Sequence, residues 1–107
     1  METVNALYIE DDAGLAFLLS DSLADEQISI THASDGETGI QMFENSSFDI
    51  VLVDHEMPGL SGIDVIQRLQ FDENPPPIIM VTGAGNEQVA VRAMQVGASD
   101  YVVKDVS

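Results

Sequence analysis

The chain has 107 residues and a hydrophobic fraction of 45%, which suits one domain with an apolar core over residues 1–107 and argues against disorder. Three basic residues stand against 19 acidic ones, so the net charge is −16, and we expect no direct binding to nucleic acid or to membranes. The chain has no cysteine, no apolar run near the roughly 20 residues of a membrane span and no signal-peptide pattern, so we expect a soluble, cytoplasmic protein.

The first elements are a short strand and an amphipathic helix. The apolar run Ala6–Ile9 predicts a buried strand, and three acids follow it, Glu10, Asp11 and Asp12. Leucines at helical spacing predict a helix from about residue 13 to residue 24, with Asp12 as its cap and its leucines in the core.

The next elements are an edge strand and a short helix. Apolar and polar residues alternate from Ile28 to Ala33, which is typical of a half-buried strand. The turn residues 34–36 then precede a second helix, which we expect over Glu37–Phe43.

The stretch from residue 48 to residue 62 reads FDIVLVDHEMPGLSG and carries the most informative pattern. Ile50–Val53 are continuously apolar and predict a buried strand that delivers the carboxylate of Asp54 where the apolar run stops. Pro58, Gly59 and Gly62 then predict a turn, so Asp54 should lie at a loop-lined edge of the sheet.

The following segment repeats the pattern of helix and strand. Ser61 is placed to cap a third helix that carries Ile63–Leu69 and ends before the prolines 75–77. Ile78–Val81 predict another buried strand, which ends in the hydroxyl of Thr82.

The last elements are a fourth helix and a fifth strand. Asn86 is placed to cap the helix and Gly97 to end it, and Asp100–Val103 predict a strand that ends in Lys104. Strands that alternate with helices over short connections predict an α/β fold, an open parallel sheet with helices on both faces.

Polar residues gather at the carboxyl ends of the predicted strands. They are Glu10, Asp11 and Asp12, Asp54, Thr82 and Lys104. Crowded carboxylates repel one another unless a cation lies between them, and oxygen ligands of this kind suit Mg²⁺. Beside such an ion, Asp54 is able to act as a nucleophile that forms an aspartyl phosphate, with Lys104 as the counter-charge and Thr82 as a hydrogen-bond donor.

From Asn5 to Lys104 the chain resembles the receiver domain of two-component response regulators. The residues that carry the resemblance are Glu10-Asp11, Asp54, Met57-Pro58-Gly59, Gly62, Thr82, Tyr101 and Lys104. The resemblance implies a flavodoxin-like sheet of order 2-1-3-4-5. It also implies Mg²⁺ held by Asp11, Asp54 and the main-chain carbonyl of Glu56, with Glu10 joining through water.

The resemblance further implies a signalling switch rather than an enzyme, one that promotes only its own phosphorylation and dephosphorylation. A histidine kinase or a histidine phosphotransfer protein would give its phosphoryl group to Asp54. Thr82 would then move toward that group, Tyr101 would follow inward, and the face that binds partners would change.

Two features depart from the receiver pattern. Asp105 replaces the proline that usually follows the lysine, so we expect a trans bond there, because cis costs about 3 kcal/mol without proline. The chain also stops at Ser107, before a fifth helix. We therefore expect part of one sheet face to be uncovered. We also expect the chain to be a piece of a longer regulator with an output domain beyond Ser107, or to form a homodimer through that face.

Two other functions fit the sequence less well than the switch. An aspartate-nucleophile phosphatase typically has a second aspartate where this chain has Glu56, and a flavodoxin has a hydroxyl- and glycine-rich turn where this chain has three acids. A receiver-like interaction module that is never phosphorylated remains the alternative. We expect His55 to be a solvated residue at the rim, and we assign no chemistry to His32.

Overall fold

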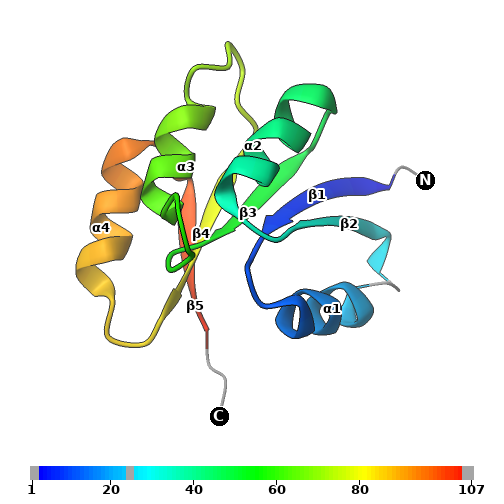
Figure 1. Cartoon of the computed structure of the whole chain (residues 1–107), viewed down its shortest axis with the longest axis horizontal. Helices are drawn as coiled ribbons and strands as arrows, with labels where there is room; N and C mark the ends of the chain where they lie inside the picture. The colour runs from blue at the N-terminus through cyan, green and yellow to red at the C-terminus, as the bar shows by residue number, and fades with distance from the viewer. Residues whose placement is uncertain (1–2, 24–25, 105–107) are drawn as a thin grey trace.

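The computed structural model describes residues 3–23 and 26–104, with only the main chain of Lys104 (Figure 1). Strands and helices alternate along this part of the chain. In order they are β1 (Val4–Ile9), α1 (Ala13–Ser22), β2 (Ile28–Ala33), α2 (Gly36–Asn45), β3 (Ile50–Asp54), α3 (Gly62–Leu69), β4 (Ile78–Gly83), α4 (Glu87–Val96) and β5 (Asp100–Lys104). Every strand and helix predicted from the sequence is present.

The strands form one parallel sheet in the order β2-β1-β3-β4-β5, which confirms the predicted topology. Helices α2, α3 and α4 cover one face of this sheet, and α1 covers the other face near β1 and β2 (Figure 1). Each connection runs from the carboxyl end of a strand into a helix. The carboxyl ends of β1, β3, β4 and β5 therefore share one edge of the sheet.

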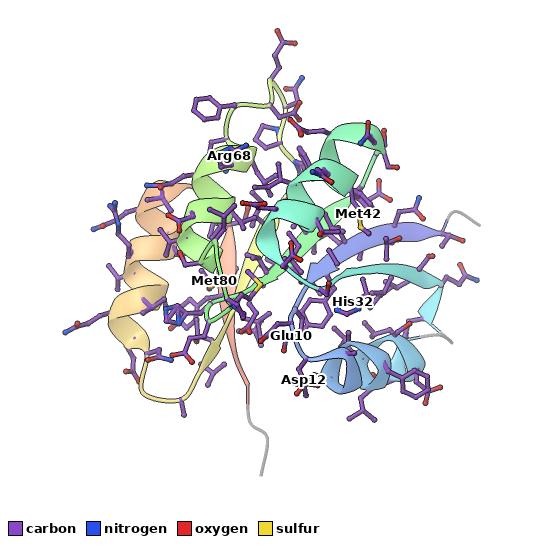
Figure 2. The ribbon with its side chains drawn as sticks, viewed as in Figure 1. Glu10, Asp12, His32, Met42, Arg68 and Met80 are labelled. Carbon is purple, nitrogen blue, oxygen red and sulfur yellow. The ribbon has the colours of Figure 1, made fainter. Side chains whose placement is uncertain are left out.

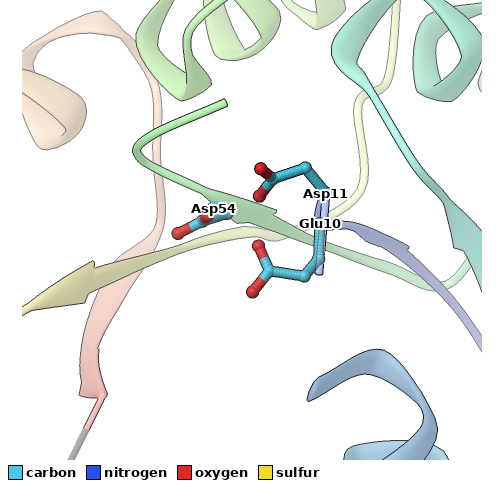
Figure 3. Close-up of side chains that lie close together, drawn as sticks. All are labelled: Glu10, Asp11 and Asp54. Atoms are coloured by element: carbon cyan, nitrogen blue, oxygen red, sulfur yellow. The ribbon is translucent and has the colours of Figure 1, made fainter. Parts of the chain in front are cut away.

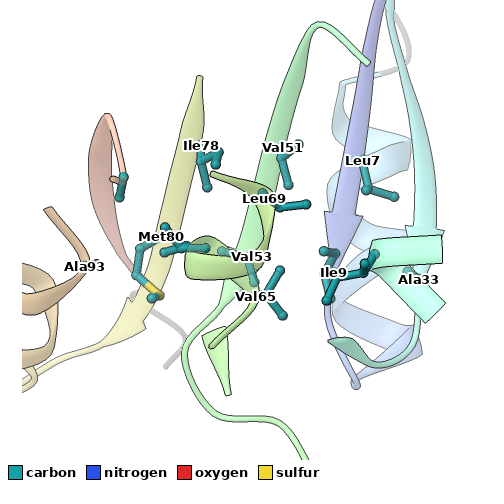
Figure 4. Packing of buried hydrophobic residues seen from close by; sticks show 13 residues of the cluster. Leu7, Ile9, Ala33, Val51, Val53, Val65, Leu69, Ile78, Met80 and Ala93 are labelled. Atoms are coloured by element: carbon teal, nitrogen blue, oxygen red, sulfur yellow. The ribbon is translucent and has the colours of Figure 1, made fainter. Parts of the chain in front are cut away.

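The main core lies between the sheet and helices α2 to α4 (Figure 4). Alternate strand residues face this layer, because side chains of a strand point to opposite faces in turn. The strands contribute Leu7, Ile9, Val51, Val53, Ile78 and Met80, and α3 contributes Val65, Ile66 and Leu69. This packing fixes the ends of β1, β3 and β4 relative to one another.

The opposite face of the sheet is covered less completely. Along β4, Ile79 and Val81 are half-buried between buried neighbours, and Val102 on β5 is 53% exposed, which agrees with the expectation that part of one face is uncovered. The prediction that the leucines of α1 lie in the core is wrong, because Leu18 is 63% exposed and Leu15 and Leu19 are only half-buried. This short helix packs through Ala16, and in the described residues no second helix lies beside it to cover Leu18.

The helix ends show which predicted caps form. Asp12 caps α1, and Ser61 caps α3 in a reciprocal capping box with Asp64, both as predicted. Asn86 precedes α4 but makes no side-chain cap hydrogen bond, because its backbone is not extended there. Gly97 ends α4 with a φ of 127°, as its glycine predicted.

None of the helices in the described part of the chain has the length and apolar character that a membrane crossing requires.

Candidate functional site

Three carboxylates meet where β1 and β3 end (Figure 3). Glu10 and Asp11 directly follow β1, and Asp54 is the last residue of β3. One carboxylate oxygen from each side chain lies within 4.8 Å of the others. Glu10 is fully buried and Asp54 is 5% exposed, whereas Asp11 is open to water. The two strand ends coincide because Ile9 pairs with Val53.

These carboxylates border a pocket of about 340 Å³. Its lining is polar and acidic, with Glu10, Asp11, Asp12, Asp54, His55, Glu56 and Asn86 among the residues that form it. Carboxylate and carbonyl oxygens are the ligands that Mg²⁺ takes in proteins, and three close carboxylates repel one another without a cation. The donor set at this edge of the sheet therefore fits a hard divalent cation such as Mg²⁺.

The position of Asp54 depends on the turn that follows it. The N–H of His55 donates to the carbonyl of Val81 over 3.0 Å, and the N–H of Gly62 donates to the carbonyl of His55 over 3.2 Å. A Cβ on Gly62 would collide with the main-chain carbonyl of Asp54. The start of α3 therefore packs directly on the backbone of Asp54, which only glycine permits.

Thr82 and Tyr101 come together beside the carboxylates. Thr82 is 1% exposed at the end of β4, and Tyr101 is 42% exposed on β5. Both line a second pocket of about 100 Å³, which shares Gly83 and Asn86 with the acidic pocket. The structure thus brings the two residues of the predicted switch to one small pocket at the edge where Asp54 lies.

Lys104 belongs to the same edge of the sheet through its main chain. It ends β5 and pairs with Gly83 at the end of β4. The side chain of Lys104, Asp105 and the bond between them lie outside the described residues. The predicted role of Lys104 and the predicted trans bond therefore stay predictions.

The two histidines differ from what the sequence indicated. His55 lines the acidic pocket and is half-buried, and its Nδ1 is buried with no hydrogen-bond partner in the described part of the chain. His32 lies at the end of β2, and its Nε2 is 2.6 Å from the main-chain oxygen of Glu10. No sequence pattern indicated this contact, because it depends on how β1 and β2 are aligned.

A larger pocket, of about 790 Å³, lies at the opposite edge of the sheet, between the carboxyl ends of α2 and α3. Phe43, Phe48 and Phe71 are among its lining residues. None of the three clustered carboxylates borders it. The site is therefore identified by its chemistry rather than by the size of its pocket.

A model of the response regulator receiver domain family matches residues 6–107. The chain belongs to this family. Receiver domains are signalling domains of two-component systems. The matched residues include all three clustered carboxylates, Glu10, Asp11 and Asp54.

Individual relatives extend this result. This receiver domain is 39% identical over 103 residues to the sensory transduction protein RegX3 of Mycolicibacterium smegmatis, and 34% identical over 105 residues to the transcriptional regulatory protein FixJ of Bradyrhizobium diazoefficiens. These matches cover 96% and 97% of this chain but only 45% and 51% of the relatives. The chain thus spans about half the length of these curated relatives.

Solved structures show the same fold. A response regulator receiver domain protein of Clostridium thermocellum has a TM-score of 0.89 at 28% identity, and the match covers 97% of this chain and 84% of that one. Full-length FixJ of B. japonicum has a TM-score of 0.88 at 31% identity, covering 100% of this chain and 53% of FixJ.

Proposed function

We propose that this receiver domain is a phosphorylatable switch and that Asp54 is its phosphoryl acceptor. The observation that carries the proposal is the nearly buried carboxylate of Asp54, which meets two more carboxylates at the end of β3. A strand-end carboxylate of this kind is held in place by the sheet, so its oxygens face one pocket. Membership of the receiver family supports the same assignment.

Mg²⁺ is the cofactor that we propose for this site. Asp11, Asp54 and the main-chain carbonyl of Glu56 would hold it, with Glu10 acting through water. The bound ion would supply positive charge that lets an anionic phosphoryl group approach the carboxylates. The open position of Asp11 provides the side from which a cation enters.

The proposed reaction is transfer from a phosphohistidine on a histidine kinase or a histidine phosphotransfer protein. A carboxylate oxygen of Asp54 attacks phosphorus, a P–O bond forms and the P–N bond breaks, and the electron pair stays on the departing imidazole nitrogen. Thr82 would donate a hydrogen bond to the transferred group, and Lys104 would pair with its charge. The domain would promote only its own phosphorylation and later hydrolysis.

The readout of phosphorylation would lie on the side of β4 and β5. Thr82 moves toward the new phosphoryl group, and Tyr101 turns inward into the volume that the small pocket offers. Val91 and Met94 on α4 and Val103 on β5 are exposed apolar side chains on the elements that flank Tyr101. A change at Tyr101 would therefore change an apolar surface that a partner protein can sense.

The partners that we propose follow from the lengths of the relatives. Because this chain spans 45% of RegX3 and 51% of FixJ, an output domain beyond Ser107 is the first candidate for the effector. A homodimer through the partly uncovered sheet face is the second candidate. In either case we propose that residues 1–107 are one domain and that it acts in the cytoplasm, without binding nucleic acid or membranes itself.

The test is incubation with acetyl phosphate and Mg²⁺, followed by intact mass spectrometry. The wild type should gain the mass of one phosphoryl group, and chelation of Mg²⁺ should prevent the gain. Asp54→Asn should not be modified, whereas Asp72→Asn, at an exposed carboxylate away from the site, should match the wild type. Equal modification of Asp54→Asn would contradict the assignment, and an unmodified wild type that also fails to bind Mg²⁺ would favour an interaction module.

A further inference from the structure

A side chain of β2 reaches the turn that carries two of the clustered acids. The Nε2 atom of His32 lies 2.6 Å from the main-chain oxygen of Glu10, and Figure 2 shows the two residues side by side at the ends of β2 and β1. A carbonyl oxygen can only accept a hydrogen bond, so Nε2 of His32 must carry a hydrogen and donate it. This bond therefore fixes both the direction of the Glu10 carbonyl and a proton on Nε2.

The turn formed by residues 10–12, called the acid turn below, is held at both ends. At its start, the N–H of Glu10 donates to the carbonyl of Ala33 over 2.9 Å, next to the bond from His32. At its end, a carboxylate oxygen of Asp12 accepts from the amides of residues 14 and 15, over 2.9 and 3.1 Å. Only Asp11 lies between these two anchors.

Asp11 depends on those anchors for its position. Its side chain is exposed and makes no hydrogen bond to any described residue, so no side-chain contact fixes where its carboxylate points. The main chain must do so instead. The carbonyl of Glu10 belongs to the peptide plane that joins Glu10 to Asp11, and its direction therefore sets the direction in which Asp11 leaves β1.

We propose that His32 is a positioning residue for the metal site. By holding the carbonyl of Glu10, it holds the peptide plane that aims Asp11 at Asp54. His32 would not itself be a ligand of the metal ion. This inference rests on the proposed function, because it assumes that the cluster binds Mg²⁺. Residues that orient metal ligands influence the affinity of a site without touching the ion.

The sheet itself has little need of this hydrogen bond. β2 pairs with β1 along six consecutive residues, from Val4 with Ile28 to Ile9 with Ala33. The carbonyl of Glu10 lies just beyond the last of these pairs. The side chain of His32 donates a hydrogen bond to this carbonyl, outside the strand pairing itself. Its loss should therefore disturb the acid turn more than the stability of the fold.

The experiment compares His32→Phe, which keeps a ring but no donor, with His32→Gln, whose amide nitrogen lies near the position of Nε2. Isothermal titration calorimetry measures Mg²⁺ affinity on the full chain, and urea unfolding measures stability. His32→Phe should bind Mg²⁺ roughly 2- to 10-fold more weakly, the range that one hydrogen bond supplies, and His32→Gln should recover the wild-type affinity. Thr31→Ala, an exposed neighbour on the same strand, is the matched control and should bind normally.

A second readout comes from phosphorylation with acetyl phosphate. The rate for His32→Phe should be low at subsaturating Mg²⁺ and return to the wild-type rate at saturating Mg²⁺, a pattern that a general loss of stability would not produce. If His32→Phe does not fold, nitrogen NMR of the wild-type ring replaces it. The Nε2 resonance should then be that of a protonated nitrogen, and it should shift on addition of Mg²⁺.

The outcomes separate this proposal from the one on which it rests. Equal Mg²⁺ affinity in the wild type and in His32→Phe would overturn the role of His32 and leave the proposed function standing. Equal weakening in His32→Phe and His32→Gln would also overturn it, because the donor would then not matter. A wild type that binds no Mg²⁺ and gains no phosphoryl group would contradict both proposals.

Discussion

The two halves of the carboxyl edge are built differently. On the side of β1, three kinds of hydrogen bond hold the acid turn. His32 donates to the carbonyl of Glu10, the N–H of Glu10 donates to Ala33, and Asp12 caps α1. On the side of β4 and β5, Thr82 and Tyr101 border a small pocket, and the helix that follows begins at Asn86 without a side-chain cap. The turn after β1, on the side called the anchored region below, is therefore fixed by side-chain hydrogen bonds at both ends, whereas the helix after β4 begins without a side-chain cap.

The two regions differ in the way that the two steps of the proposed switch, phosphoryl transfer and readout, require. Phosphoryl transfer needs carboxylates that stay in place while charge is transferred, because misplaced groups lose much of their effect. A readout needs an element with two arrangements that the new charge can bias. We therefore expect changes in the anchored region to alter chemistry and changes in the Thr82–Tyr101 region to alter the response.

Among changes outside the carboxylate cluster, the largest effect should come from Gly62→Ala, which disturbs the anchored region. The added Cβ would collide with the main-chain carbonyl of Asp54, and backbone must move to relieve the collision. We expect a loss of about 1 to 3 kcal/mol in the free energy of unfolding, and a phosphorylation rate at least tenfold lower. Urea unfolding and acetyl phosphate kinetics measure the two effects.

Gly83→Ala is the control for that change. A Cβ on Gly83 would lie 3.5 Å from the side chain of Asn86, which is ordinary contact. It should cost far less stability than Gly62→Ala. Equal behaviour of the two variants would show that the close approach of α3 to Asp54 has no special importance.

Thr82→Val tests the link between the two halves. Valine has nearly the same shape but lacks the hydroxyl, so the phosphoryl group would lose one hydrogen-bond donor. We expect Asp54 still to be modified, about tenfold more slowly, and the environment of Tyr101 to stop responding. Mass spectrometry follows the first effect and tyrosine fluorescence follows the second. A normal response at Tyr101 would break the proposed connection.

Tyr101→Ala should have a smaller effect on chemistry. The side chain is 42% exposed and contributes no oxygen to the carboxylate cluster. We expect Mg²⁺ affinity and phosphorylation rate within about twofold of the wild type, which fits a residue outside the anchored region. A tenfold change in either quantity would show that the two halves of the edge are not separable.

The smallest effect concerns Asp35, which caps α2. The pKa of Asp35 is held below its ordinary value of 3.8. The main cause is the hydrogen bond from the N–H of Thr38, and the second is the hydrogen bond from the hydroxyl of Thr38. A carboxyl whose folded pKa is depressed stabilises the fold above its unfolded pKa, and this stabilisation is lost as pH falls through the folded pKa.

Asp35→Asn keeps a capping oxygen but removes the charge, so it isolates this contribution. Urea midpoints of the wild type and the variant should differ at pH 5 to 7, and the difference should shrink below pH 3.8. A difference that stays constant down to acid pH would contradict the assignment.

Much of the fold could be predicted because several of its strands are continuous apolar runs. Ile50–Val53 and Ile78–Val81 are each followed by a polar residue, so the sequence alone predicts Asp54 and Thr82 at the same edge. The chain order then fixed which ends meet, since parallel strands joined by helices all end on one side.

Other features could not be read from the sequence, because they depend on neighbours in space. Leucine spacing in α1 shows an amphipathic helix, but it does not show what lies beside it, and Leu18 is exposed. The bond from His32 to Glu10 depends on the register of two strands and on one side-chain orientation. Neither the exposure of Leu18 nor the bond from His32 can be predicted from the order of residues.

The measurement that tests the account most directly is amide NMR of the wild type in two steps, with Mg²⁺ alone and then with acetyl phosphate added. Mg²⁺ alone should shift the amides of the acid turn and of residues 54–56. Phosphorylation should then shift the amides of Thr82 and Tyr101 as well. Absence of the first set of shifts, or phosphorylation of Asp54 with no change at Thr82 and Tyr101, would contradict it.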